Sequence, residues 1–202
     1  MKEEKKSRYN QSPTKKGSVI MPLPQERIYT IDDIYTLPEG TRAELIDGQI
    51  YYIAPPNRIH QKILMELSGT IRDYIRSKRG NCEVYSAPFA VFLNEDDINY
   101  FEPDISVICD RNKLTDKGCS GAPDWIIEIT SPSNSSHDYI TKLYKYKAAG
   151  VREYWIVNPE RQMITVYLFK ETDTFPQNYG FTDKIKVSIY DNLVIDFSEL
   201  NI

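Results

Sequence analysis

The chain has 202 residues, of which 41% are hydrophobic, and this is enough for one compact domain with a sizeable core. Its formal net charge of −4 and pI near 5.3 argue against a protein that holds DNA by its overall positive field. No apolar run approaches the ~20 residues that cross a bilayer, and no apolar segment follows the charged N-terminus. We therefore expect neither a membrane span nor a signal peptide.

The first 26 residues differ in character from the rest of the chain. The opening stretch, MKEEKKSRYNQSPTKKGS, is polar and almost free of aliphatic side chains. Such a segment cannot bury enough apolar surface to offset the entropy that is lost on ordering. We predict a flexible polar tail over residues 1–26 and one folded domain over residues 27–202.

The first elements of that domain are a short helix and a hairpin. Thr30 is a suitable cap for the helix, which Pro38 would stop. The dipeptide Asp47-Gly48 tolerates the positive φ angles of a two-residue turn. It predicts paired strands of about 42–46 and 49–53.

A long helix is predicted over residues 58–79. Asn57 is placed to cap it, and Gly80 is placed to end it. Apolar residues recur at helical spacing along this stretch at Ile59, Ile63, Leu64, Leu67, Ile71 and Ile75.

In the rest of the domain the sequence predicts strands before and after a second helix. That helix is expected over residues 136–149, with Ser135 or Ser136 as its cap and Gly150 past its end. Strand-like runs occur at 83–93, 103–109, 124–130, 153–159, 162–169 and 184–190. The order β-β-α-β-β-β-α-β-β-β predicts a mixed sheet with helices packed on it, including a right-handed crossover from 124–130 to 153–159.

The three cysteines, Cys82, Cys109 and Cys119, are widely spaced and form no CxxC pair. An odd number of cysteines without zinc-type spacing predicts reduced thiols, and neither a disulfide framework nor a zinc site. This usage is typical of a cytoplasmic protein.

Glu128 is anomalous because it lies inside the apolar run DWIIEIT. A buried carboxylate without a cation would be penalised by several kcal/mol, so a metal ion, a lysine or an arginine is needed nearby. Asp104 opens the apolar strand PDISVIC, and Glu44 lies within AELIDG. Each acid alone is explained by a satisfied strand end or turn. Three of them on one sheet favour a site for Mg²⁺ or Mn²⁺.

The second helix offers a cation for these acids. Asp138 and Lys142 are four residues apart and share a face of the helix. Lys142 borders the apolar stripe that packs on the sheet, so it can approach the carboxylates. The alternative is a surface Asp–Lys pair worth a few tenths of a kcal/mol.

Several motifs follow one another along the chain: ELIDG, Asn57-x-x-His60, PDISV, GAPDWIIEITSPS, a D-x-x-x-K helix and AAGVREYWIVNP. Over residues 28–200 the sequence resembles the Uma-two family, described as putative restriction endonucleases, a branch of the PD-(D/E)xK nuclease superfamily. The resemblance implies an α/β fold with a restriction-endonuclease-like core. In that fold a mixed β-sheet is flanked by helices and preceded by an N-terminal β-hairpin.

The resemblance also implies site residues. Asp104 corresponds to the acid of the PD motif, Glu128 to the acid of (D/E)xK, and Glu44 to an acid from the hairpin. His60 matches a family position near the site. Thr130 stands where the superfamily has its lysine, and in this family that lysine is replaced by one on the following helix, where Lys142 lies.

The implied function is a metal-dependent endonuclease that hydrolyses phosphodiester bonds in DNA. Mg²⁺, or Mn²⁺, would be held by Asp104, Glu128 and the carbonyl of Ile129, with Glu44 acting directly or through water. Lys142 would orient or deprotonate the attacking water. Small nucleases of this kind work as homodimers with one active site for each strand, so a homodimer is expected.

Two other functions remain open at this stage. A nuclease-like fold can bind nucleic acid or a protein partner without cutting, which the acidic charge and the displaced lysine allow. A sugar or nucleotide hydrolase built on paired carboxylates would leave Lys142 unexplained. Stacking on bases and packing within the sheet are both open for Tyr51, Tyr52, Tyr85, Tyr100 and Phe101.

Overall fold

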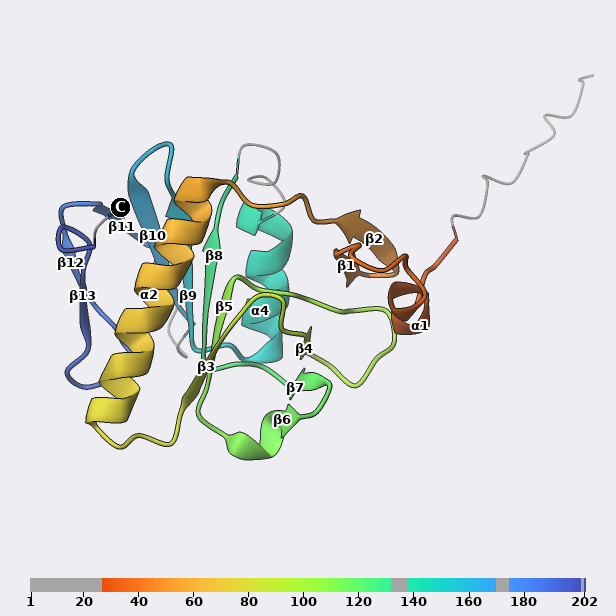
Figure 1. The fold of residues 1–202 in the computed structure, drawn as a ribbon. Helices are drawn as coiled ribbons and strands as arrows, with labels where there is room; N and C mark the ends of the chain where they lie inside the picture. Colours follow the sequence, from red (N-terminus) through yellow and green to blue (C-terminus); the bar gives the residue numbers. More distant parts are fainter. Residues whose placement is uncertain (1–26, 132–137, 170–174, 201) are drawn as a thin grey trace, which may run out of the picture.

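The computed structural model describes residues 27–131, 138–169, 175–200 and 202 (Figure 1). The predicted tail over residues 1–26 and the predicted caps Ser135 and Ser136 lie outside the described residues.

The centre of the molecule is a six-stranded mixed sheet with the order β11-β10-β9-β8-β5-β3. Strands β8 and β9 are parallel neighbours, as the crossover prediction requires, and the other pairs are antiparallel. The bounds are β3 Glu83–Ser86, β5 Ile105–Ile108, β8 Trp125–Ile129, β9 Glu153–Asn158, β10 Met163–Leu168 and β11 Gln177–Gly180. The predicted α/β class with a mixed sheet is confirmed.

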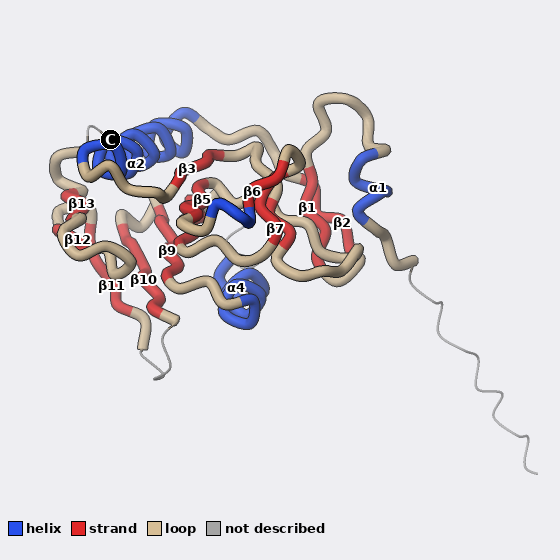
Figure 2. Tube along the Cα trace, turned by 90° about the horizontal axis from the view of Figure 1, so that it is seen from below, coloured by secondary structure: helices blue, strands red, loops and turns tan. Residues whose placement is uncertain are grey.

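Helices cover both faces of this sheet. α2 (Arg58–Ser77) packs on one face and α4 (Leu143–Ala149) on the other, and Figure 2 shows them on opposite sides of the strands. The five residues before α4 form a wider π-helical turn, η2 (Asp138–Lys142). Because side chains alternate along a strand, Trp125 in β8 packs on the side of α2 and its neighbour Ile126 packs on the side of α4.

Smaller elements surround this core. The hairpin and α1 lie to one side of the main sheet, away from the β10–β11 edge (Figures 1 and 2). The bounds are α1 Ile31–Tyr35, β1 Ala43–Ile46, β2 Gln49–Tyr52, β4 Val91–Phe92, η1 Arg111–Lys113, β6 Leu114–Thr115, β7 Gly118–Ser120, β12 Lys184–Lys186 and β13 Val194–Asp196.

The hairpin and the start of α2 form where the sequence predicts them. Asp47 and Gly48 both take positive φ, at 50° and 74°, and they join β1 to β2 in register. The Asn57 side chain accepts a hydrogen bond of 2.9 Å from the N–H of His60, which caps α2. At the far end of α2 the positive φ of 51° falls on Arg79, one residue before the expected Gly80.

Two ion pairs join the hairpin to the second helix. Lys145 in α4 forms an ion pair with Asp47 in the hairpin turn. Lys142, at the end of η2, forms another with Glu44 in β1. Two lysines one turn apart therefore hold the hairpin against the helix.

Two strand predictions are wrong in extent. The run 83–93 is two strands in two sheets: β3 ends at Ser86, and β4 pairs instead with β7. The break coincides with Pro88, which has no N–H to continue a ladder. The run 184–190 yields only β12, which pairs with the unpredicted strand β13.

The prediction of reduced thiols is wrong for two of the three cysteines. Cys82 and Cys109 form a disulfide. Cys82 directly precedes β3 and Cys109 directly follows β5, and the register pairs Glu83 with Ile108, so the two cysteines meet across the strand ends. Cys119 is free and buried, and burial raises the pKa of its thiol to about 11. Within the described part of the chain, no helix is long and apolar enough to cross a membrane.

Candidate active site

Glu128 lies in the interior with two hydrogen-bond donors on one of its oxygens. It is 4% exposed and points from β8 toward the face covered by α4. Its Oε1 accepts from Lys142 Nζ at 2.8 Å and from the Tyr146 hydroxyl at 2.7 Å. A cation and a neutral donor therefore stabilise the carboxylate where an isoleucine would otherwise fit.

Lys142 bridges two acids that are distant in the sequence. Its Nζ lies 2.8 Å from Glu128 Oε1 and 3.0 Å from Glu44 Oε2, and all three side chains are about 5% exposed. The second oxygen of Glu44 accepts the backbone N–H of Glu102 at 3.0 Å. The ammonium thus joins the hairpin to the central strand through a buried charge cluster.

Asp104 forms a second centre beside this cluster. Its Oδ2 accepts the N–H of Ile129 at 2.8 Å and lies 3.1 Å from His60 Nε2. Within the described residues Asp104 Oδ1 accepts no hydrogen bond. The Nδ1 atom of His60 is buried and also has no partner there. Asp104 Oδ1 and His60 Nδ1 are thus polar atoms with no hydrogen-bond partner among the described residues.

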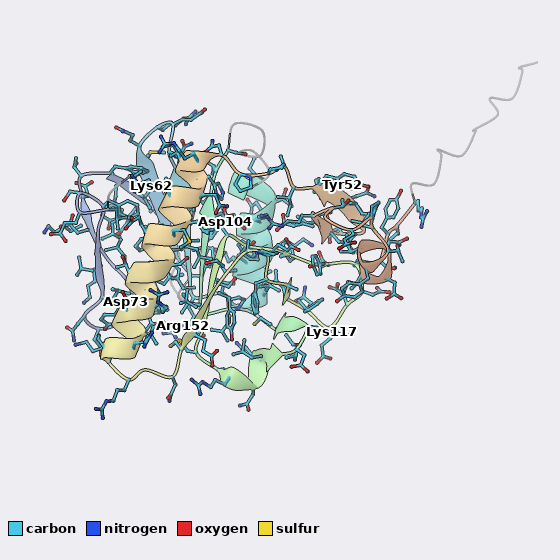
Figure 3. All side chains as sticks on the ribbon, in the orientation of Figure 1. Tyr52, Lys62, Asp73, Asp104, Lys117 and Arg152 are labelled. Carbon is cyan, nitrogen blue, oxygen red and sulfur yellow. A yellow bond between two sulfur atoms is a disulfide. The ribbon has the colours of Figure 1, made fainter. Side chains whose placement is uncertain are left out.

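The two centres share one cavity of about 490 Å³. Figure 3 labels Asp104 beside α2 and Tyr52 on the hairpin, and both line this cavity. All six site residues expected from the sequence line it: Glu44, His60, Asp104, Glu128, Ile129 and Lys142. The Asp138 side chain, expected beside Lys142, lies outside what is described.

The donor chemistry of this cavity fits a divalent cation of the Mg²⁺ type. Carboxylate oxygens are its preferred ligands. Glu128 supplies them from β8, and Asp104 supplies them from the position just before β5, the neighbour of β8. The expected convergence of a third acid is not found. Among the described residues no group of three His, Cys, Asp or Glu side chains is placed to hold a metal ion. Glu44 has both oxygens engaged, one by Lys142 and one by the N–H of Glu102.

A cation also lies at the edge of the cavity. Arg42 Nη2 is 2.8 Å from Glu102 Oε2, and both residues line the cavity. Tyr100 donates to the other oxygen of Glu102 at 2.9 Å. Tyr100 is buried in the cluster around the hairpin, so its ring packs and is not available to stack on a ligand.

Tyr146 is the site residue that the sequence did not reveal. In the sequence Tyr146 is one of the apolar-stripe residues of the second helix, a position that predicts packing alone, and it is fully buried between Phe101 and Tyr154. Burial, and then the charge of Glu128, raises the pKa of its hydroxyl well above the ordinary value of 10.0. It therefore remains a neutral hydrogen-bond donor to Glu128 throughout the physiological range.

Comparisons with known proteins identify the family and the fold of this chain. The family Uma2, described as "Putative restriction endonuclease", matches residues 31–193. An uncharacterized protein, slr1290, of Synechocystis sp. is 26% identical over 146 residues, which cover 71% of this chain and 75% of that protein. The crystal structure of a "putative nuclease belonging to DUF820" from Anabaena variabilis has a TM-score of 0.69 and 23% identity, covering 85% of this chain and 96% of its own. That likeness shows the fold. Because the family model matches residues 31–193, this chain belongs to the Uma2 family, which is described as "Putative restriction endonuclease".

Proposed function

We propose that the protein is a metal-dependent endonuclease that hydrolyses phosphodiester bonds in DNA. The description of the family and the fold of the Anabaena structure support nuclease-like chemistry. The observation that carries the proposal is the position of Lys142. Its ammonium bridges Glu44 and Glu128 inside a cavity that also exposes Asp104. A hydrolytic site needs this combination of fixed acids, a cation and an open cavity.

Asp104 and Glu128 would hold Mg²⁺ or Mn²⁺, with the carbonyl of Ile129 as a further ligand. Two carboxylates suffice because Mg²⁺ keeps several waters and takes substrate phosphate oxygens. When bound, the ion would neutralise charge on the phosphate and lower the pKa of a coordinated water. Among the described residues nothing donates to Asp104 Oδ1, so this oxygen would be available to the ion.

The other residues orient these groups. Glu44 holds the ammonium of Lys142 from the hairpin side, so the amine lies beside Glu128. There it can orient an attacking water or stabilise negative charge on the phosphate. His60 contacts Asp104 Oδ2, so that oxygen is fixed while Oδ1 remains available.

Two copies would act together when both strands of a duplex are cut, because one site serves one strand. This proposed homodimer is checked by light scattering with and without a duplex oligonucleotide. A single mass at the weight of one 23.5 kDa chain in both conditions would exclude it.

The function is tested by incubating the protein with plasmid, duplex and single-stranded DNA, and with RNA, in Mg²⁺ or Mn²⁺. We expect cleavage of DNA that stops in chelator. Glu128→Gln keeps the side-chain volume and removes the charge, and should lower the rate by at least about 100-fold. Glu160→Gln, at an exposed turn after β9, is the matched control and should retain the rate.

Two outcomes would count against the proposal. Cleavage that is equal in the wild type and in Glu128→Gln would reject the assigned site. Nucleic acid that binds and is never cut with either ion would favour the non-catalytic nuclease-like module instead.

A further inference from the structure

The cavity has two chemically different walls. One wall carries the charged groups, including Glu128, Lys142 and Asp104. A second wall is formed by the end of the hairpin and the segment after it, and it carries no charged side chain. Its residues are Tyr51, Tyr52, Ile53, Ala54, Pro55 and Pro56. With a divalent cation on its carboxylates the first wall suits a phosphate, and the second suits a flat apolar group.

Tyr51 belongs to the second wall and neighbours a residue of the charged cluster. In the hairpin register Tyr51 is directly opposite Glu44, and cross-strand partners point to the same face with Cβ atoms about 5 Å apart. Glu44 in turn contacts Lys142 at 3.0 Å. Tyr51 is therefore a direct cross-strand neighbour of Glu44, which belongs to the charge cluster. Tyr51 is 40% exposed, so a part of its surface is accessible to a ligand.

Its neighbour Tyr52 lines the same cavity and is 66% exposed. The other aromatic residues considered from the sequence are less accessible. Phe101 and Tyr100 are buried, and Tyr85 stacks on Phe89 at 4.2 Å. The hairpin tyrosines are thus the aromatic side chains that the structure offers to this cavity.

The size of the cavity limits what can reach Tyr51. Its volume of about 490 Å³ is within the range of roughly 300–1,000 Å³ typical of pockets for small ligands. One nucleotide is a ligand of that class. In a paired duplex both faces of each base are covered by its neighbours, so an aromatic ring can stack only on a base that is unpaired or turned out of the helix.

We propose that this site takes its substrate as an unpaired nucleotide, with the base stacked on Tyr51 and the phosphate at the wall of Lys142 and Asp104. The substrate class is single-stranded or locally unpaired nucleic acid. This inference rests on the proposed nuclease function and specifies its substrate. A single strand needs one site for each cut, so this substrate does not require the homodimer.

The test measures binding, separately from cleavage. Fluorescence anisotropy with Ca²⁺ in place of Mg²⁺, so that the carboxylates are still neutralised, compares a labelled 12-nucleotide single strand, its duplex, and that duplex with three unpaired central nucleotides. We expect the two substrates with unpaired bases to bind at least about 10-fold tighter than the duplex. Tyr51→Ala should weaken their binding by about 5- to 150-fold, the range for loss of one base–aromatic stack. Tyr51→Phe should stay within about 2-fold of the wild type because it keeps the ring.

The matched control is Tyr144→Ala, since Tyr144 is 69% exposed on α4 and does not line the cavity. It should bind like the wild type. If Tyr51→Ala fails to fold by circular dichroism, Tyr51→Leu replaces it, because leucine keeps apolar bulk and lacks a π-face.

The outcomes separate this inference from the proposed function. Equal or tighter binding of the fully paired duplex, or equal affinities of Tyr51→Ala and wild type for the single strand, would overturn the inference even if Mg²⁺-dependent cleavage occurs. Ring-dependent binding of unpaired bases without any cleavage would support the inference and reject the hydrolytic function.

Discussion

Lys142 is the residue on which the charge balance of the site depends. Its ammonium is buried at 4% exposure between Glu44 and Glu128. Transfer of such ions from water is expensive, and a buried pair is often no more stable than apolar side chains of similar volume. The cluster is therefore better explained by chemistry in the cavity than by its contribution to stability.

Replacing Lys142 should lower the stability of the fold, because the two carboxylates that it neutralises lose their cation. Lys142→Met should lower the free energy of unfolding by about 3–5 kcal/mol, because it leaves buried carboxylates without a cation. Adding Glu44→Gln to that variant should recover part of the loss. Urea denaturation measures both, and Lys186→Met, at an exposed position in β12, should change stability by less than about 0.5 kcal/mol. A double variant that is less stable than Lys142→Met would contradict the electrostatic account.

Tyr146 should act on the site through Glu128. Tyr146→Phe removes only the hydroxyl that donates to Glu128 Oε1 at 2.7 Å. Because that bond stabilises the ionised carboxylate, its loss should move the acid limb of the pH–rate profile to higher pH. A purely structural role for the hydroxyl would lower the rate equally at every pH, and that result would count against this role.

At the scale of elements, the first turn of α2 positions His60. The Asn57 side chain accepts the N–H of His60 itself, so the cap fixes the residue that contacts Asp104. Asn57→Ala should cost about 1 kcal/mol in thermal or urea unfolding. Asn57→Asp keeps a capping oxygen and favours the helix dipole, so it should unfold like the wild type. Equal losses in both variants would show that Asn57 contributes through some contact other than the cap.

The sequence predicts an element well when residues within that element alone favour its conformation. Asp47-Gly48 predicts a turn by its backbone preferences, and Asn57 with the apolar periodicity after it predicts α2. The small sheet of β4, β6 and β7 has no such signal, because its strands are two or three residues long. Its pairing depends on tertiary contacts such as the bridge from Val91 to Phe101.

The same distinction applies to the site. Glu128, Asp104 and Glu44 are conspicuous in the sequence because carboxylates occur in or beside apolar strands. Lys142 borders the apolar stripe of the second helix, and the motif order adds His60. Tyr146 is not conspicuous, since a tyrosine in an apolar helix stripe is ordinary. Only the packing of that helix on β8 shows that its hydroxyl reaches Glu128.

At the scale of the whole molecule, the site lies where the hairpin, α2 and the second helix meet the central sheet. α2 supplies His60 from one face of the sheet, and the second helix supplies Lys142 from the other. The disulfide between Cys82 and Cys109 joins the start of β3 to the end of β5, the strand that Asp104 precedes. Pairing of these cysteines could not be predicted from their count, because it depends on the register of β3 and β5.

Two partly buried tyrosines should make the fold sensitive to alkali. Burial raises the pKa of Tyr190 from 10.0 to about 12, and a hydrogen bond to Glu83, followed by burial, raises that of Tyr85 to about 12. A pKa that is higher in the folded state gives stability that is complete below pH 10 and is lost as the pH rises from 10 toward 12. Urea denaturation should therefore give a falling free energy of unfolding between pH 10 and pH 12.

Tyr190→Phe should reduce that fall. At pH 8 it should match or exceed the wild type in stability, because the Tyr190 hydroxyl is buried without a partner in the described structure. Tyr144→Phe, on the exposed face of α4, should leave the pH dependence unchanged. A flat profile from pH 9 to pH 12 would contradict the assignment of raised pKa values.

The most direct measurement is the binding of Mn²⁺ to the protein by calorimetric titration, compared with Asp104→Asn, Glu128→Gln and the control Glu160→Gln. The account predicts one ion per chain for the wild type and the control, and at least about 10-fold weaker binding for the two cavity variants. Equal affinities for all four proteins would contradict it, because the ion would then not be held by Asp104 and Glu128.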